Sequence, residues 1–229
     1  MVIPDQYRKC VIFLFADSPD SGRQPIGTAF IVGVPAEPPQ HAATAPALGT
    51  NEGWFIHYLV TARHIVSLSR KYGPLFARVH TADGETSFLD FPQEAWHEHA
   101  TADVAVAVLR MATPLDHTTI PIESFELDAT VTAHRVSIGD EVFFMGLFSE
   151  HPGAERNEPI ARFGNISLMP TLVRVDLGDS TGRQRAYLVE ARSWGGHSGS
   201  PAFVFFPPDR FLNSISVSAA MPIFLLGLV

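Results

Sequence analysis

Residues 195–203, with the sequence GGHSGSPAF, place Ser198 between glycines on both sides. A serine hydroxyl attacks a carbonyl when a base takes its proton and hydrogen-bond donors meet the oxyanion that forms. Small residues around the serine let the backbone amides of Gly196 and Ser198 point at one spot, as an oxyanion hole requires. The same residues also fit a glycine-rich hairpin turn without chemistry, and this stretch alone does not decide between the two.

Two other segments supply groups that could serve this serine. In residues 59–66 (LVTARHIV), His64 lies just past an apolar strand on a turn of small residues, and imidazole has the pKa range that a general base needs. Asp103 begins the apolar segment DVAVAVL, where a half-desolvated carboxylate can accept an imidazole N–H and fix its tautomer. Each is weak alone, because the chain has ten histidines and aspartate is common where strands begin.

The order His64, Asp103, Ser198, each within its local motif, is more specific than any one of them. TARHIV, DVAVAVL and GHSGSP resemble the T-A-x-H motif, the aspartate strand and the G-x-S-G-x-P motif of the chymotrypsin-like (trypsin-fold) serine peptidases. Residues 27–32 are similar to that family's strand before the histidine. Residues 138–147 and 162–167 are similar to the opening of the second barrel in bacterial trypsin-like and HtrA-type members.

The resemblance implies an all-β fold of two Greek-key β-barrels with the active site in the cleft between them. Residues 1–125 would form the N-terminal barrel and carry His64 and Asp103, and residues 126–229 would form the C-terminal barrel and carry Ser198. Together they would make one peptidase domain of a longer protein.

The resemblance also assigns roles. Ser198 would be the nucleophile, His64 the general base and then acid, and Asp103 the orienting carboxylate, with the N–H groups of Gly196 and Ser198 as the oxyanion hole. The implied activity is that of a serine endopeptidase, which hydrolyses peptide bonds of a protein or peptide substrate through an acyl-enzyme. It implies no cofactor and no metal.

Two residues correspond to the family's primary substrate pocket. Arg192 stands six positions before Ser198, where the family has the pocket floor, and a basic floor would favour an acidic substrate side chain. Trp194 could form the rim. The alternatives are that Arg192 pairs with Glu190 or faces solvent, and that Trp194 is ordinary packing.

The chain departs from the family pattern at three places. His197 replaces the aspartate of zymogen-activated members, so we expect no activation by a new N-terminus. Ser200 replaces the second glycine, a mild change. The chain stops at Val229, inside a strand that in the family runs on to line the substrate site, so we expect a truncated peptidase domain. A regulatory domain C-terminal to this chain would then be a partner.

The composition of the chain indicates which partners and which cellular location to expect. A net charge of −8 without a Lys/Arg run argues against nucleic acid as a partner. The single cysteine, Cys10, permits no intramolecular disulfide. The N-terminus lacks a signal-peptide pattern, and no apolar run approaches the ~20 residues of a membrane span. We therefore expect a cytoplasmic protein that binds no membrane.

The chain alternates between short apolar strands and turn residues, as in a sandwich or barrel. We expect a short helical turn at 62–71, a long surface loop at 35–53 and a connection between two halves at 111–137. The expected strands are 11–15, 27–34, 54–60, 75–80, 87–91, 103–109, 141–147, 164–168, 171–177, 186–190, 202–206 and 222–229.

Other functions fit less well. The G-x-S-x-G elbow of the α/β-hydrolases needs a glycine at Ser200 and a later histidine, and none follows Ser198. A metal site at His97, Glu98 and His99 lacks a further ligand in view. The alternative that stays open is a non-catalytic or partner-activated trypsin-fold module that binds a protein or peptide.

Overall fold

The computed structural model describes residues 3–37, 54–110, 114–125, 136–192, 195–206 and 223–229. Its first sheet has the strand order β5-β4-β1-β2-β3-β7-β6, with β8 paired in parallel to β2. The strands of this sheet are β1 (Val11–Ser18), β2 (Gly22–Ala36), β3 (Trp54–Thr61), β4 (Leu75–His80), β5 (Thr86–Phe91), β6 (Trp96–Glu98), β7 (Ala105–Val108) and β8 (Ile120–Pro121).

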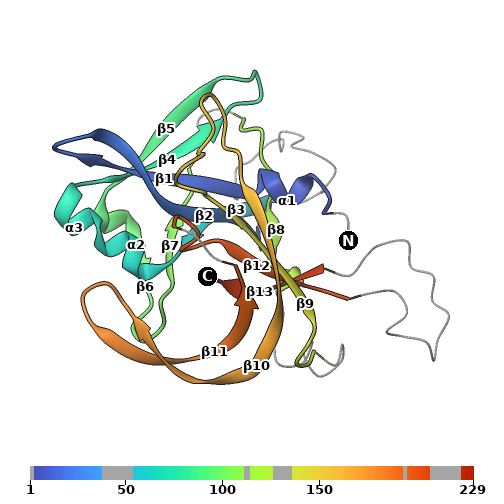
Figure 1. Cartoon of the computed structure of the whole chain (residues 1–229). Coiled ribbons are helices and arrows are strands. Elements are labelled where there is room, and N and C mark those ends of the chain that lie inside the picture. The colour runs from blue at the N-terminus through green and yellow to red at the C-terminus, as the bar shows by residue number, and fades with distance from the viewer. Residues whose placement is uncertain (1–2, 38–53, 111–113, 126–135, 193–194, 207–222) are drawn as a thin grey trace.

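The second sheet has the order β11-β10-β9-β12-β13, and all of its described neighbours pair antiparallel. Both sheets curl into half-barrels that pack on each other, which confirms the expected all-β, two-barrel trypsin-like fold (Figure 1). The strands of the second sheet are β9 (Glu141–Gly146), β10 (Ile160–Asp176), β11 (Thr181–Ala191), β12 (Pro201–Phe205) and β13 (Ile223–Leu228).

The helices in the described part of the chain are short. Among the described residues, no helix is both long and apolar enough to cross a membrane. The described helices are α1 (Gln6–Lys9), α2 (Arg63–Ser67), α3 (Ser69–Tyr72), η1 (Gln93–Ala95) and η2 (Ile122–Ser124). Helices α2 and α3 confirm the helical turn expected at 62–71, whereas α1 was not expected.

One strand expectation was wrong. The segments 164–168 and 171–177 are not separate strands but parts of β10, which is 17 residues long. The register of β10 against β11 shifts between Ile166 and Leu168 and again between Leu168 and Thr171. Such irregularities let a strand accommodate Pro170, which has no N–H for the ladder, without ending.

Other differences concern the loops. β2 runs to Ala36, into the loop expected at 35–53, and residues 38–53 of that loop lie outside the described part of the chain. The connection expected at 111–137 contains β8 and η2. The strand expected at 103–109 is β7, which begins only at Ala105, so Asp103 lies before the strand. The aspartate is therefore free of the β-ladder and can be held by side chains.

Buried aromatic side chains from both sheets pack together in one cluster. Phe13 and Phe30 of the first sheet share one buried cluster with Phe143 and Phe203 of the second. The rings of Phe143 and Phe203 stack with centroids 5.0 Å apart, and Tyr7 meets both rings edge-on. Burying such side chains is worth about 1.5–3 kcal/mol each, so the hydrophobic effect holds the half-barrels together here.

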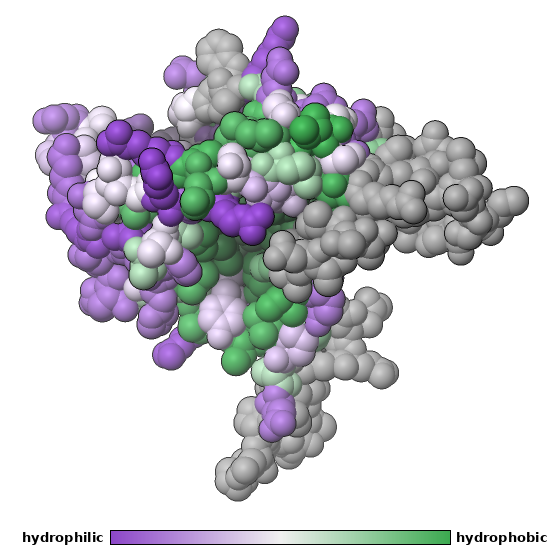
Figure 2. Space-filling model, turned by 90° about the horizontal axis from the view of Figure 1, so that it is seen from below, coloured by the Kyte–Doolittle hydropathy of each residue, from purple (hydrophilic) through white to green (hydrophobic). Residues whose placement is uncertain are grey.

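A further apolar cluster lies within the second half-barrel. It is centred on Val142, Phe144 and Val204, with partly buried apolar side chains of β11 and β13 packed against it. Figure 2 views the molecule from the side of β10 and β11 and shows apolar side chains gathered in the middle of that face. The second half-barrel therefore keeps a partly open apolar face.

The polar link between the two sheets runs through Thr28 of β2, which is fully buried. Its N–H donates to Ser198 O at 2.9 Å, and its hydroxyl donates to Gly196 O at 2.8 Å while it accepts from Leu147 N at 2.9 Å. Its carbonyl accepts from Thr61 Oγ1 at 2.6 Å. The polar groups of this residue thus join β2 to the serine segment, to the residue that follows β9, and to β3.

We expect Thr28→Val to lower the free energy of unfolding by at least about 2 kcal/mol, because an unpaired buried donor or acceptor costs about 1–3 kcal/mol. Valine keeps the shape but leaves Leu147 N and Gly196 O without this partner. Denaturant unfolding measures the loss, with the exposed Thr171→Val as control. A loss as small as that of the control would contradict the role of the hydroxyl.

Candidate active site

His64 and Asp103 meet at two points. The Nδ1 atom of His64 lies 2.6 Å from Asp103 Oδ2, and the backbone N–H of His64 donates to Asp103 Oδ1 at 2.8 Å. An ionised carboxylate only accepts, so the neutral imidazole carries its proton on Nδ1 and leaves a lone pair on Nε2. The side chains are 29% and 13% exposed, so the carboxylate is the more shielded of the two.

Asp103 is held in place by Gln184 of the second sheet and by the turn that precedes it in sequence. Its backbone N–H donates to Gln184 Oε1 of β11 at 2.8 Å. The ring of His99 accepts hydrogen bonds from the N–H groups of Thr101 and Ala102 through Nδ1, which shapes the turn before the aspartate. His99 is therefore part of the support of Asp103. Among the described residues there is no group of three or more metal-ligating side chains.

The hairpin of β10 and β11 reaches across to helix α2, which carries His64. Gly178, at the tip of this hairpin, has φ +88°, and a Cβ there would overlap the side chain of Ser67 and lie 2.9 Å from His64 Cα. Only glycine allows this conformation and this close approach together. The second half-barrel therefore supports the histidine from outside.

Four charged side chains fasten the hairpin tip to the first half-barrel. Arg63 and Arg70 of the helical turn each pair with Glu98 of β6 and with Asp179 of the tip, at 2.6 to 3.1 Å. The hydrogen bond from Arg70 holds the pKa of Asp179 below its usual range. Arg63 and Glu98 are less than 20% exposed, which limits screening of that pair by solvent.

The serine turn packs directly against the segment that leads to His64. Gly199 has φ +83°, and a Cβ there would overlap Thr28 O and Thr61 Oγ1 and lie 3.1 Å from Ala62 N. Ser198 is partly exposed, whereas Gly199 and Ser200 are buried. The structure thus brings the turn of Ser198 beside the histidine, but among the described residues no hydrogen bond joins the Ser198 hydroxyl to His64.

The two amides expected in the oxyanion hole have no acceptor among the described residues. The N–H groups of Gly196 and Ser198 make no hydrogen bond there, whereas the carbonyl groups of both residues accept bonds from Thr28. Gly196 has φ +101°, and a Cβ would lie 2.8 Å from Leu147 O. The carbonyls of Gly196 and Ser198 are therefore held by Thr28, and the N–H groups of these two residues are left for another acceptor.

His197 and Ser200, the two departures beside Ser198, are both buried. Ser200 donates its N–H to His197 O at 2.8 Å and packs on Gly146, where a Cβ would overlap the Ser200 hydroxyl. His197 is 2% exposed, and its ring lies edge-on to that of Phe144. Its Nε2 accepts from Arg162 Nε at 3.4 Å, which places the proton on Nδ1.

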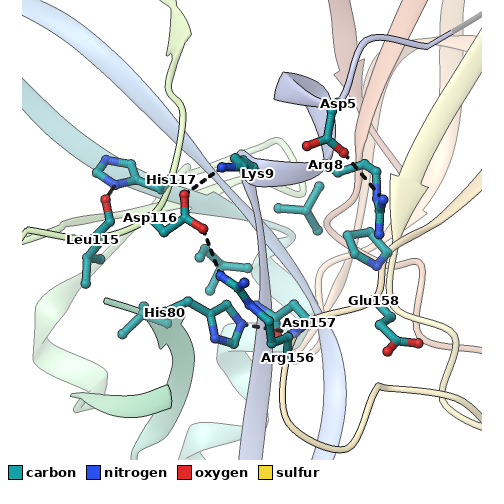
Figure 3. A pocket seen from close by; sticks show the side chains of 14 residues that line it. Asp5, Arg8, Lys9, His80, Leu115, Asp116, His117, Arg156, Asn157 and Glu158 are labelled. Atoms are coloured by element: carbon teal, nitrogen blue, oxygen red, sulfur yellow. Dashed lines mark hydrogen bonds and ion pairs between the residues drawn. The ribbon is translucent and has the colours of Figure 1, made fainter. Parts of the chain in front are cut away.

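The residues expected in the substrate pocket are less well placed. Arg192 follows β11 and is exposed, which agrees with the alternative that its side chain faces solvent. Trp194 lies outside the described residues. A cavity of about 340 Å³ lies elsewhere, between α1, β4 and residues 156–159 (Figure 3). Its lining contains none of the expected site residues.

Sequence reasoning missed Thr28, Gln184 and Asp179, which hold the site together. The glutamine and the aspartate lie in or beside β11, more than 70 positions from Asp103, and no motif marks them. The glycine at 178 was the one available signal, since a glycine beside an aspartate and a serine indicates a tight turn.

No protein-family model matches the chain, and no curated protein matches its sequence. Among solved structures, the chain is similar to the protease domain of MamO from Magnetospirillum magneticum in its apo form. The TM-score is 0.51 at 14% identity, over 96% of this chain and 93% of that one. This likeness shows the fold of a protease domain, and at this identity it shows the fold alone.

We expect part of the acid sensitivity of this protein to come from His197. Burial, reinforced by the Arg162 cation, lowers the pKa of His197 to about 4, against about 6.5 for an unfolded histidine. Between these two values the unfolded chain binds the additional proton. The free energy of unfolding should therefore fall as the pH falls from 6.5 to 4, by on the order of 3 kcal/mol.

Denaturant unfolding of wild type and His197→Gln between pH 4 and 7 measures this pH dependence of the free energy of unfolding. The variant should lose the part that comes from His197. His97→Gln, at an exposed site, is the matched control and should keep it. An equally steep pH dependence in His197→Gln would show that other groups account for it.

Proposed function

We propose that this chain is a trypsin-like serine endopeptidase domain that cleaves peptide bonds through an acyl-enzyme. The observation that carries the proposal is the two-point contact between Asp103 and His64, at 2.6 and 2.8 Å. This contact with a half-buried carboxylate fixes both the position of the ring and its tautomer. The turn of Ser198 packs beside it, against Ala62.

In the proposed first step, His64 Nε2 takes the proton of the Ser198 hydroxyl as Oγ bonds to the scissile carbonyl carbon. The N–H groups of Gly196 and Ser198 stabilise the oxyanion, since neither donates to a described residue. The C–N bond then breaks as His64 gives its proton to the leaving amine. Water, activated by the same histidine, attacks the acyl-enzyme and releases the acid and Ser198.

Asp103 orients the base and stabilises the imidazolium that forms in each half-reaction. It need not take up a proton for this role. Its own position depends on Gln184 of the second half-barrel, so the base is held by both halves of the fold. On the resemblance alone, we assign Arg192 to the floor of the primary substrate pocket and Trp194 to its rim.

The proposal includes membership of the bacterial, HtrA-type branch of the trypsin-like peptidases. The TARHIV, DVAVAVL and GHSGSP segments are similar to motifs of bacterial trypsin-like peptidases of the HtrA type. The likeness to a bacterial protease domain supports the fold on which that resemblance depends. We propose a cytoplasmic peptidase whose substrate is a protein or peptide.

A second candidate function is a trypsin-fold module that binds a protein or peptide and becomes active only with a partner. The observation in its favour is that no hydrogen bond joins the Ser198 hydroxyl to His64 among the described residues. Such bonds are often long in a free enzyme and tighten in the substrate complex, so this observation is compatible with both functions.

Labelling with a fluorophosphonate probe tests the proposal. The probe reacts with an activated serine, so we expect wild type to be labelled and Ser198→Ala and His64→Ala not to be. His97→Ala is the control for loss of a histidine, because His97 is exposed and outside the site. Labelling of none of these proteins would favour the binding module, and labelling of Ser198→Ala would overturn the nucleophile assignment.

Asp103→Asn should reduce the labelling rate by ~10⁴-fold, because the amide favours the wrong histidine tautomer. With Oδ1 retained on the His64 N–H, the amide NH₂ would face Nδ1 and force the proton onto Nε2. The rate of labelling measures this, with the exposed Asp20→Asn as matched control. A variant within a few-fold of wild type would show that Asp103 does not set the tautomer.

A further inference from the structure

The loop between β9 and β10, residues 147–159, contacts the peptide that enters the serine turn. Ser149 N and Ser149 Oγ each lie 3.3 Å from Gly195 O and donate to it. Ser149 occupies the second position of a β-turn, because His151 N donates to Phe148 O at 2.8 Å. The carbonyl before Gly196 thus has a donor on a separate loop.

This contact determines where the Gly196 N–H points. The described chain has no cis peptide bond, so the Gly195 carbonyl and the Gly196 N–H lie in one peptide plane and point in opposite directions. With its oxygen turned to Ser149, the peptide turns its N–H away from the loop. A reversed peptide would present a carbonyl oxygen in place of a donor, and an oxyanion could not bind there.

The loop itself is anchored on the first half-barrel by a buried cation. Arg78 of β4 is 5% exposed and donates to Asn157 Oδ1 at 2.7 Å, to Gly153 O at 3.0 Å, and also to Pro152 O and Arg156 O. A guanidinium has five N–H donors in a fixed plane, so it can bind several carbonyls of one loop at once.

Two more contacts fasten the same end of the loop. Asn157 Nδ2 donates to Arg78 O, and Asn157 N donates to His80 Nε2, both at 2.9 Å. Arg156 pairs with Asp116, which also binds Lys9; Figure 3 shows these side chains around the cavity that this end of the loop lines. The loop is therefore anchored on β4 at one end and donates hydrogen bonds to the Gly195 carbonyl at the other.

We propose that the backbone N–H of Ser149 is a positioning donor that keeps the Gly195–Gly196 peptide in the orientation an oxyanion hole requires. Among the described residues, Ser149 makes no hydrogen bond to the proposed nucleophile or to the base, and it acts through the Gly196 N–H. The inference rests on the proposed function for its consequence in catalysis. Its structural part, the orientation of one peptide, can be tested separately.

Ser149→Pro removes the N–H and suits the site, because proline is favoured at the second position of common β-turns. The matched control is Ile138→Pro. Ile138 holds the same position in the turn closed by Asp140 N and Ser137 O, before Gly139 at φ +94°. It is 59% exposed, and its N–H donates to no described residue. Ser149→Ala keeps the N–H and removes only the hydroxyl.

The first readout is the rate of fluorophosphonate labelling as a function of pH. We expect Ser149→Pro to be labelled 10- to ~10²-fold more slowly at every pH, with the midpoint of the profile unchanged, because loss of one oxyanion donor typically costs ~10²–10³-fold and His64 is untouched. Ser149→Ala should lose less than about threefold, since hydroxyl removal leaves the N–H bond. A rate for Ser149→Pro equal to that of Ile138→Pro would overturn the proposal.

The second readout is the NMR chemical shift of the Gly195 carbonyl carbon and the Gly196 amide nitrogen. We expect both to move in Ser149→Pro and to stay in place in Ile138→Pro. Unmoved resonances would overturn the proposal whether or not the protein is labelled. Moved resonances in a protein that is never labelled would support the peptide orientation and reject the peptidase function, so the two failures are distinguishable.

If Ser149→Pro does not fold, hydrogen exchange in wild type decides the question. The Ser149 amide should exchange more slowly than that of Glu150, which lies in the same turn and donates to no described residue. Equal exchange of the two amides would show that Gly195 O does not hold Ser149 N, and the proposal would fall.

Discussion

The site depends on Thr28, a buried threonine that joins the two half-barrels through hydrogen bonds to Ser198, Gly196 and Leu147. It also accepts a hydrogen bond from Thr61 of its own half-barrel. The apolar cluster between the sheets attracts the two half-barrels to each other, but apolar contacts do not fix direction. Directional bonds at a fully buried residue do so, because an unpaired polar group there is costly. Thr28 therefore sets the register between the turn of Ser198 and the segment that leads to His64.

The two half-barrels support each other's chemistry. The first carries His64 and Asp103, yet Gln184 and Asp179 of the second hold the strand start and the helical turn in place. The second carries Ser198, yet the loop that contacts Gly195 is braced by Arg78 of the first. A candidate site between two halves would otherwise move with any shift between them, and catalytic geometry is sensitive to displacements of about 1 Å.

Much of the fold could be predicted from local pattern, because alternating apolar runs bounded by turn residues indicate strands. The pattern gave β4 its bounds and gave most other strands to within a few residues. It failed at β10, where Pro170 suggested a break, since bulges against a partner strand are a tertiary compensation. It also missed α1, which is four residues long and too short for a periodic signal.

The sequence by itself determined the identities and order of His64, Asp103 and Ser198 and the glycines that let their turns form, because those depend on side-chain chemistry and local backbone freedom. Only the tertiary structure decided which residues hold them. Thr28, Gln184, Arg78 and Ser149 act across separations of 70 to 170 residues or through backbone groups that carry no side-chain signature. Such contacts follow from the packing of two curled sheets, which local pattern does not specify.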